Sequence, residues 1–113
     1  MKVFVYGTLR KNRSNHWFLR EAKHVCDAYT DNNYTLYVAG LPCMVKEAGN
    51  GGVFGEVYEV DEHTLEQLDR LEGHPDFYKR EDIWVYEAAT GHDIKVQTYI
   101  YQGKPKGTKV RSY

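Results

Sequence analysis

The chain has 113 residues, of which 42% are hydrophobic and 14% aromatic, and this predicts one compact domain with one core. The formal net charge is −1 and no long run of one sign occurs, which excludes a strong positive electrostatic field that would attract polyanions. No nucleic acid partner is therefore expected. No segment of the sequence reaches the roughly 20 apolar residues that span a bilayer, and MKVFVYGTLR meets glycine and charge too early for a secretory leader. We therefore expect a cytoplasmic protein with no membrane partner.

The first half of the chain predicts strands with one short helix. Residues 2–6 form an apolar run that suits a strand buried on both faces, and Gly7 ends it. A short helix is expected over about 15–23, with Ser14 or Asn15 as its N-cap. Residues 24–30 and 34–40 flank Asp31-Asn32-Asn33, whose side chains favour turns, and this indicates two strands joined as a hairpin.

Breaks in the middle of the chain separate two further strands. Pro42 and the GNGG sequence at 49–52 interrupt the pattern, with a brief strand expected over 43–45 between them. Residues 53–60 alternate in the period of a strand, and Gly55 within it indicates a bulge or a close approach to the backbone.

The hydrophobic period then changes from two to 3.6. Asp61 is the expected N-cap of a helix over 62–72, in which Leu65, Leu68 and Leu71 mark a buried stripe. Gly73 and Pro75 end this helix.

Two more strands, over 80–89 and 93–101, are expected to form a hairpin around Thr90-Gly91-His92. The order of elements predicts an α+β fold whose mixed or mainly antiparallel sheet can curl into a small β-barrel flanked by about two helices. Residues 1–103 are assigned to this domain, and residues 104–113 to a flexible basic tail, because the end of the chain lacks an apolar period.

Glu72 is the strongest candidate for acid–base chemistry. It follows Leu68 by four residues and Leu65 by seven, so the helical period places it on the buried face. Burial there and the negative end of the helix dipole both raise the pKa of a carboxyl group toward the range of a general base. The alternative reading is a carboxylate that swings from a frayed last turn into water.

Cysteine and histidine residues give no sign of a metal site or a disulfide framework. Cys26 and Cys43 are far apart and form no C-x-x-C sequence, so we expect reduced thiols. The five histidines lack ligand spacing, and Gly7-Thr8 is followed by no G-K-[ST] sequence of a nucleotide loop. Neither a metal nor an organic cofactor is predicted.

Four segments carry a resemblance to a known family. VFVYGTLR at 3–10, GEVYEVD at 55–61, LDRLEGHPDFYKR at 68–80 and QTYIY at 97–101 occur in the order and spacing of the γ-glutamylcyclotransferase-like family. The chain resembles its small bacterial and viral-type members and the γ-glutamylamine cyclotransferases over about residues 2–102. The resemblance implies a small mixed β-barrel flanked by helices.

The resemblance also implies an activity and its residues. Enzymes of this family cyclise a γ-glutamyl group to 5-oxoproline and release the attached amine. The match implies that Glu72 is the catalytic glutamate, and it assigns substrate binding to six residues: Tyr6, Gly7, Thr8, Leu9, Tyr78 and Tyr101. No cofactor is implied, and the partner is a small γ-glutamyl substrate.

Other functions remain open from the residues alone. A non-catalytic binder that sequesters a small molecule could use the same fold. An enzyme of this fold could instead remove the γ-glutamyl group from another metabolite. Tyr78 can serve packing alone, the protein can be a monomer or a weak homodimer, and the short KEAGNGG segment at 46–52 predicts an open mouth to the site.

Overall fold

The structure is a computed structural model that describes residues 1–49 and 51–113. The described residues form eight strands, one α-helix and one 3-10 helix, joined by turns and loops. In chain order they are β1 (Lys2–Val5), η1 (His16–Leu19), β2 (Lys23–Thr30), β3 (Thr35–Ala39), β4 (Leu41–Val45), β5 (Phe54–Glu59), α1 (Glu62–Glu72), β6 (Tyr78–Glu87), β7 (Asp93–Tyr101) and β8 (Thr108–Val110).

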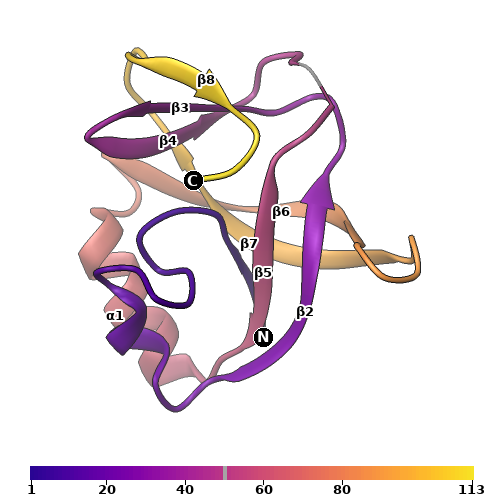
Figure 1. Cartoon of the computed structure of the whole chain (residues 1–113). Coiled ribbons are helices and arrows are strands. Elements are labelled where there is room, and N and C mark those ends of the chain that lie inside the picture. The colour runs from indigo at the N-terminus through magenta and orange to yellow at the C-terminus, as the bar shows by residue number, and fades with distance from the viewer. Residues whose placement is uncertain (50) are drawn as a thin grey trace.

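A closed barrel of five strands forms the centre of the fold, in the order β1-β5-β2-β6-β7 (Figure 1). Neighbouring strands are antiparallel except β1 and β7, which run parallel and close the barrel where Val3 faces Gln97. The predicted mixed barrel is therefore confirmed. Val3, Phe4 and Val5 are all buried, as expected for a strand covered on both faces.

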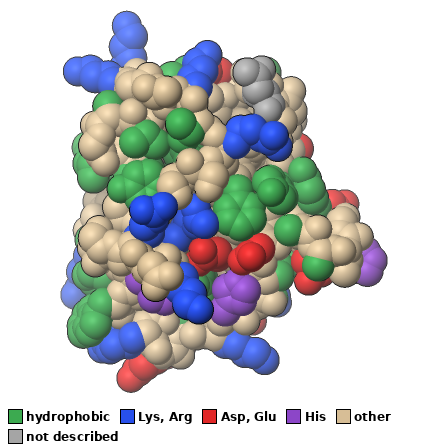
Figure 2. Space-filling view, viewed as in Figure 1, with side chains coloured by type: hydrophobic (Ala, Val, Ile, Leu, Met, Phe, Trp, Pro, Cys, Tyr) green, Lys and Arg blue, Asp and Glu red, His purple; other side chains and the backbone are tan. Residues whose placement is uncertain are grey.

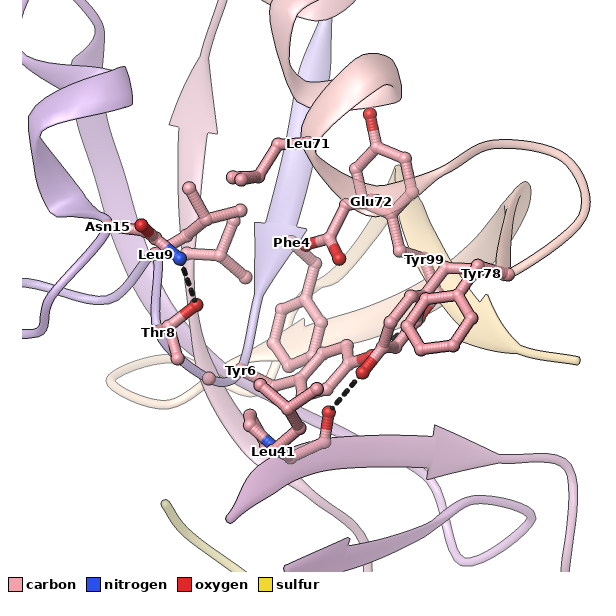
Figure 3. Close-up of a pocket in the computed structure, with 14 residues that line it drawn as sticks. Phe4, Tyr6, Thr8, Leu9, Asn15, Leu41, Leu71, Glu72, Tyr78 and Tyr99 are labelled. Atoms are coloured by element: carbon pink, nitrogen blue, oxygen red, sulfur yellow. Dashed lines mark hydrogen bonds between the residues drawn. The ribbon is translucent and has the colours of Figure 1, made fainter. Parts of the chain in front are cut away.

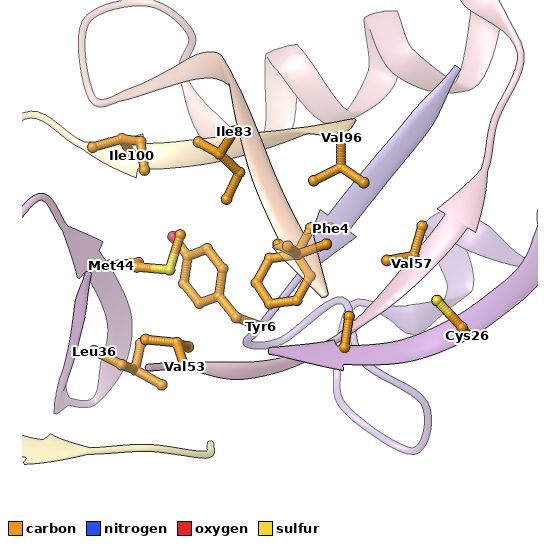
Figure 4. Packing of buried hydrophobic residues seen from close by; sticks show 12 residues of the cluster. Phe4, Tyr6, Cys26, Leu36, Met44, Val53, Val57, Ile83, Val96 and Ile100 are labelled. Atoms are coloured by element: carbon orange, nitrogen blue, oxygen red, sulfur yellow. The ribbon is translucent and has the colours of Figure 1, made fainter. Parts of the chain in front are cut away.

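A second sheet, ordered β4-β3-β8, lies against the barrel. Buried side chains of the two sheets form one cluster, in which Phe4 and Tyr6 of the barrel side meet Leu36 and Met44 of the small sheet (Figure 4). A separate cluster packs the outer face of β1 against α1 through Val5, Leu65 and Leu68. β1 thus joins both clusters, which fixes the position of the loop that follows it.

The helix α1 begins and ends as the sequence predicts. Asp61 Oδ1 accepts a hydrogen bond of 2.7 Å from the Thr64 N–H, and Gly73 ends the helix in the left-handed conformation at φ 65°. Leu65 and Leu68 are buried, but Leu71 is 37% exposed. The expectation of a buried Leu71 is wrong because this side chain lies at the rim of a pocket.

The predicted hairpin of residues 24–30 and 34–40 is wrong. β2 pairs with β5 and β6, whereas β3 pairs with β4 and β8. Thr30 directs this separation, because its N–H donates to the Val53 carbonyl and its hydroxyl accepts from the Val53 N–H, both at 2.9 Å. Asp31 does form the expected turn with Asn33, but the turn leads the chain into another sheet.

The predicted helix at 15–23 is also wrong. Only the 3-10 turn η1 forms, and β2 already begins at Lys23. The Asn15 side chain does not cap this turn; its amide donates to Thr8 Oγ1 instead. A tertiary contact has thus replaced the local cap that the sequence indicated.

Pro42 does not break the chain as predicted. It lies inside β4, opposite Val38, and the turn before it is made at Gly40 with φ 87°. β4 is an edge strand whose partner is β3, so a missing N–H is tolerated there. The strand predicted over 43–45 is confirmed as the second part of β4.

Gly55 of β5 follows the sequence prediction. A Cβ at Gly55 would lie 2.5 Å from the Val5 carbonyl oxygen and 2.6 Å from the Phe4 ring, which confirms a close approach. The β-bulge of this region lies in the facing strand β2, between His24 and Cys26.

The β6–β7 hairpin also follows the sequence prediction. β6 and β7 pair from Tyr78 to Tyr86, so the hairpin is two residues longer at its start than expected.

The prediction of a frayed tail from residue 104 is wrong. β8 pairs with β3, with Val110 opposite Leu36, and the Phe54 N–H donates to the Arg111 carbonyl at 2.7 Å. Gly107, at φ 102°, permits this approach, since a Cβ there would lie 2.2 Å from the Val38 carbonyl oxygen.

Cys26 and Cys43 are both free. Among the helices in the described ranges, none combines the length and the apolar character needed to cross a bilayer.

Candidate active site

A pocket of about 160 Å³ lies at the end of β1, where the loop after β1, the last turn of α1 and β4 meet (Figure 3). Its walls are apolar or aromatic, apart from Glu72 and the polar groups of the loop. The lining residues are Phe4, Val5, Tyr6, Gly7, Thr8, Leu9, Asn15, Leu41, Pro42, Leu71, Glu72, Phe77, Tyr78 and Tyr99.

The loop wall of the pocket is built by Gly7, Thr8 and Leu9. A Cβ at Gly7 would lie 2.4 Å from Pro42 Cγ, so glycine is needed for β4 to pack against this turn. The Thr8 carbonyl accepts a 2.8 Å hydrogen bond from the Asn15 N–H, which closes the loop. Within the part of the chain that the structure describes, the N–H groups of residues 7–9 donate no hydrogen bond. Consecutive free N–H groups of this kind can bind an anion.

The outer side of the same loop is held by Glu56, a buried carboxylate of β5. It accepts hydrogen bonds from the Lys11 N–H at 3.0 Å, from Arg10 Nε at 3.1 Å and from the Tyr58 hydroxyl at 2.9 Å. Burial raises the pKa of Glu56, but these donors and the charge of Arg10 outweigh it and lower the pKa overall. Glu56 therefore stays ionised and fixes the loop from behind.

A second hollow of about 510 Å³ lies over Glu56, between η1 and β2. Figure 2 shows the face that carries β2 and β5, where acidic, basic and histidine side chains lie intermixed. The hollow itself is lined by both signs of charge, with Lys11, Arg20, Asp27 and Glu56 among its residues. Both oxygens of Glu56 already accept hydrogen bonds from the loop or from Tyr58, so Glu56 holds the loop and is not a free carboxylate in this hollow.

Glu72 forms the opposite wall as the last residue of α1. It is half-buried, and its carboxyl group points into the pocket. Burial raises the pKa of Glu72 from 4.5 to about 7. The alternative of a frayed carboxylate in water is wrong, because the Gly73 cap holds the last turn through hydrogen bonds to Asp69 and Arg70.

Three tyrosines line the pocket with Glu72, yet the hydroxyl of each donates its proton elsewhere. Tyr6 donates to the Tyr99 carbonyl at 2.6 Å, Tyr78 to the Pro42 carbonyl at 2.8 Å, and Tyr99 to Asp69 Oδ1 at 2.7 Å. Since a hydrogen bond to the carboxylate would stabilise its charged form, the orientation of these hydroxyls preserves the high pKa of Glu72.

Six of the seven residues selected from the sequence meet in this pocket: Tyr6, Gly7, Thr8, Leu9, Glu72 and Tyr78. Tyr101 does not line it. Its ring packs instead against Phe77 and Tyr78, with centroids 5.5 Å and 5.4 Å apart. Tyr101 therefore supports the wall of the pocket from outside.

Several lining residues were missed by reasoning from the sequence. Tyr99, which lines the pocket, lies two residues before Tyr101. Strand alternation places both on one face, and this signal could have identified Tyr99. Asn15 was assigned to a helix cap. Leu41 and Phe77 are exposed by 56% and 49% at the mouth, and their apolar character alone gave no signal.

The arrangement brings together two chemical capacities. Free N–H groups at 7–9 can hold a carboxylate, and a carboxyl group with a pKa near 7 can accept and return a proton at neutral pH. A small molecule with an anionic group and an ionisable amine fits between them.

Comparisons with known proteins agree with this site. The profile of the family described as "Gamma-glutamyl cyclotransferase, AIG2-like" matches residues 3–112. A gamma-glutamylaminecyclotransferase of Rattus norvegicus is 35% identical over 112 residues, covering 88% of this chain and 75% of its own. One of Bos taurus is 42% identical over 108 residues, covering 88% and 63%.

A crystal structure of an AIG2-like protein from Mus musculus superimposes with a TM-score of 0.88 at 28% identity, covering 99% of this chain and 86% of that one. Sequence and fold therefore lead to the same conclusion. The chain belongs to the gamma-glutamyl cyclotransferase, AIG2-like family.

Proposed function

We propose that the protein is a γ-glutamyl cyclotransferase in which Glu72 acts as general base and then as general acid. The substrate is a γ-glutamyl compound, and the products are 5-oxoproline and the released amine. The relatives from rat and cattle bear the name gamma-glutamylaminecyclotransferase, which supports an amine as the leaving group.

The reaction needs one proton-transfer group. The ionised Glu72 carboxylate takes a proton from the substrate's α-ammonium, because only the free amine can attack. The bond from the α-nitrogen to the γ-carbonyl carbon forms, and the bond from that carbon to the leaving nitrogen breaks. Glu72 returns its proton to the leaving nitrogen, and the second proton lost from the attacking nitrogen also ends on the released amine, which departs as an ammonium ion.

The loop at 7–9 would hold the substrate for this ring closure. Its free N–H groups support binding of the α-carboxylate, and the packing of Pro42 against Gly7 holds the loop in place. Intramolecular attack gains mainly from orientation, so a rigid grip on the glutamyl backbone accelerates it. Tyr6 and Tyr78 would shape the pocket floor through their rings, since both hydroxyls are already bound to carbonyls.

One observation carries the proposal: Glu72, with its pKa raised to about 7, lies in the same small pocket as the free N–H groups of the loop. A pure binder has no need of a carboxyl group whose pKa is raised into the range for proton transfer at neutral pH.

The experiment is incubation of the purified protein with a panel of γ-glutamyl amines, γ-glutamyl amino acids and other γ-glutamylated metabolites, followed by mass spectrometry. We expect 5-oxoproline and the matching free amine in equal amounts. Retention of an intact compound on native mass spectra, with no 5-oxoproline from the whole panel, would instead favour the non-catalytic binder.

A further inference from the structure

The ion pair of Asp69 and Arg80 lies directly behind the candidate active site. Asp69 precedes Glu72 by three residues in the last turn of α1, so the two carboxyl groups share a face of the helix. Arg80 of β6 binds Asp69 with two hydrogen bonds, from Nε at 2.9 Å and from Nη2 at 3.1 Å. This paired geometry is the strongest that arginine makes with a carboxylate.

The same pair connects the helix that carries Glu72 to two strands of the barrel, β6 and β7. The Tyr99 hydroxyl of β7 donates to Asp69 Oδ1 at 2.7 Å, and Arg80 Nη1 donates to Gln97 Oε1 of β7 at 2.8 Å. The Arg80 N–H donates to His74 Nδ1 at 2.9 Å, which fixes the turn after the helix. Asp69 therefore ties the last turn of α1 to β6 and β7.

We propose that the Asp69–Arg80 pair positions Glu72 in two ways: it holds the last turn of α1 and the Tyr99 ring in place, and its two charges cancel beside the Glu72 carboxyl group. The inference rests on the proposed function, since it gives Glu72 the role of proton carrier. Asp69 and Arg80 are positioning residues, because neither lines the pocket.

The charge balance can be tested because each partner has the opposite effect when left alone. Side chains three residues apart on a helix are about 5–6 Å apart at Cβ, close enough for one uncompensated charge to change the proton affinity of the other. Five other ionisable side chains lie near Glu72 or beside its tyrosine neighbours in the described part of the chain. They are Tyr6, Cys43, His74, Tyr78 and Tyr99.

Three variants separate the two charges. Asp69→Asn keeps an acceptor for Tyr99 but leaves the Arg80 cation unpaired, and this lowers the pKa of Glu72. Arg80→Gln keeps a donor for Asp69 but leaves that carboxylate unpaired, and this raises the pKa of Glu72. The double variant Asp69→Asn/Arg80→Gln removes both charges, so the pKa returns to near the wild-type value.

The readout is the titration midpoint of the Glu72 carboxyl carbon, followed by NMR on protein labelled with ¹³C-glutamate and assigned with Glu72→Gln. We expect shifts of about half a pH unit or more, in opposite directions for the two single variants. Arg70→Gln is the matched control, because it removes an exposed arginine next to Asp69 and leaves the pair intact. Its midpoint should equal that of the wild type.

The pH profile of 5-oxoproline release gives a second readout. Its acid limb should move to lower pH in Asp69→Asn and to higher pH in Arg80→Gln, because activity needs the ionised carboxylate. Shifts of the same sign, or single-variant midpoints equal to that of Arg70→Gln, would overturn the inference. If one single variant fails to fold, the other still tests the sign against Arg70→Gln.

The two proposals fail in different ways. Opposed NMR shifts in a protein that releases no 5-oxoproline would keep the positioning role and refute the proposed reaction. Release of 5-oxoproline with unmoved midpoints would keep the reaction and refute the positioning role.

Discussion

Asn15 and Thr8 are joined by two hydrogen bonds, one from the Asn15 N–H to the Thr8 carbonyl at 2.8 Å and one from Asn15 Nδ2 to Thr8 Oγ1 at 3.0 Å. These bonds close the loop that carries the free N–H groups of the pocket. The side-chain bond is the part of this closure that a substitution can remove without changing the backbone.

Replacing Asn15 with alanine should weaken substrate binding more than turnover. Loss of one hydrogen bond costs about 1 kcal/mol, so KM should rise by roughly fivefold to tenfold while kcat stays within about twofold. Steady-state kinetics of 5-oxoproline release measure both constants. Asn33→Ala, which removes the side-chain hydrogen bond from Asn33 Nδ2 to Asp31 in a turn away from the pocket, is the matched control. A fall in kcat with an unchanged KM would contradict this role of the loop.

Replacing Gly7 with alanine should destabilise the fold through Pro42. The new Cβ would lie 2.4 Å from Pro42 Cγ, and such overpacking costs about 1–3 kcal/mol. Urea unfolding measures the loss. Pro42→Ala removes the clashing atom, so the double variant should recover part of the stability that Gly7→Ala loses. Additive losses in the two variants would show that the contact does not govern this site.

The stability of the protein should depend on Glu72 and on pH. Because burial raises the pKa of folded Glu72 from 4.5 to about 7, its contribution is fully present below pH 4.5 and is lost as the pH rises through 7. A shift of this size corresponds to at most about 3–4 kcal/mol. Glu72→Gln should therefore gain stability over the wild type between pH 5 and pH 8.5, as measured by urea unfolding.

The control for this measurement is Glu66→Gln, which removes an exposed carboxylate from the same helix. A stability difference between Glu72→Gln and the wild type that stays constant from pH 5 to pH 8.5 would refute the buried, proton-binding state of Glu72.

Removing residues 108–113 should destabilise the protein. The truncation takes away β8, the hydrogen bond from Phe54 to Arg111, and the bonds of Arg10 and Arg13 to the Tyr113 carbonyl. Several buried or half-buried contacts are lost together, so the free energy of unfolding should fall by about 2 kcal/mol or more. An unchanged urea midpoint would show that residues 108–113 do not stabilise the fold.

Local patterns were enough to predict the elements whose partners are near in sequence. Asp61 and Gly73 define both ends of α1 by capping alone, and β6 and β7 are joined by a short turn. The partners of β2 and β3 could not be predicted, because Asp31 and Asn33 specify a turn but not the strand that meets it. The strand β8 was missed because its pairing depends on β3, far away in sequence.

The same distinction explains the site. Glu72 was predicted because the helical period fixes its face, and burial then supplies the chemical reason for its raised pKa. The pairing of Asp69 with Arg80 was not predicted, since it requires the end of α1 to lie against β6. Asn15 was assigned to a cap because its hydrogen bond to Thr8 forms only when the loop closes.

The central claim is that Glu72 moves the proton in the cyclisation, and the rate of 5-oxoproline release by Glu72→Gln tests it most directly. The amide keeps the shape of the pocket but cannot accept a proton, so kcat should fall by about 10²- to 10⁴-fold. Ligand affinity should stay within about tenfold of the wild type. Turnover by Glu72→Gln at the wild-type rate would contradict the account.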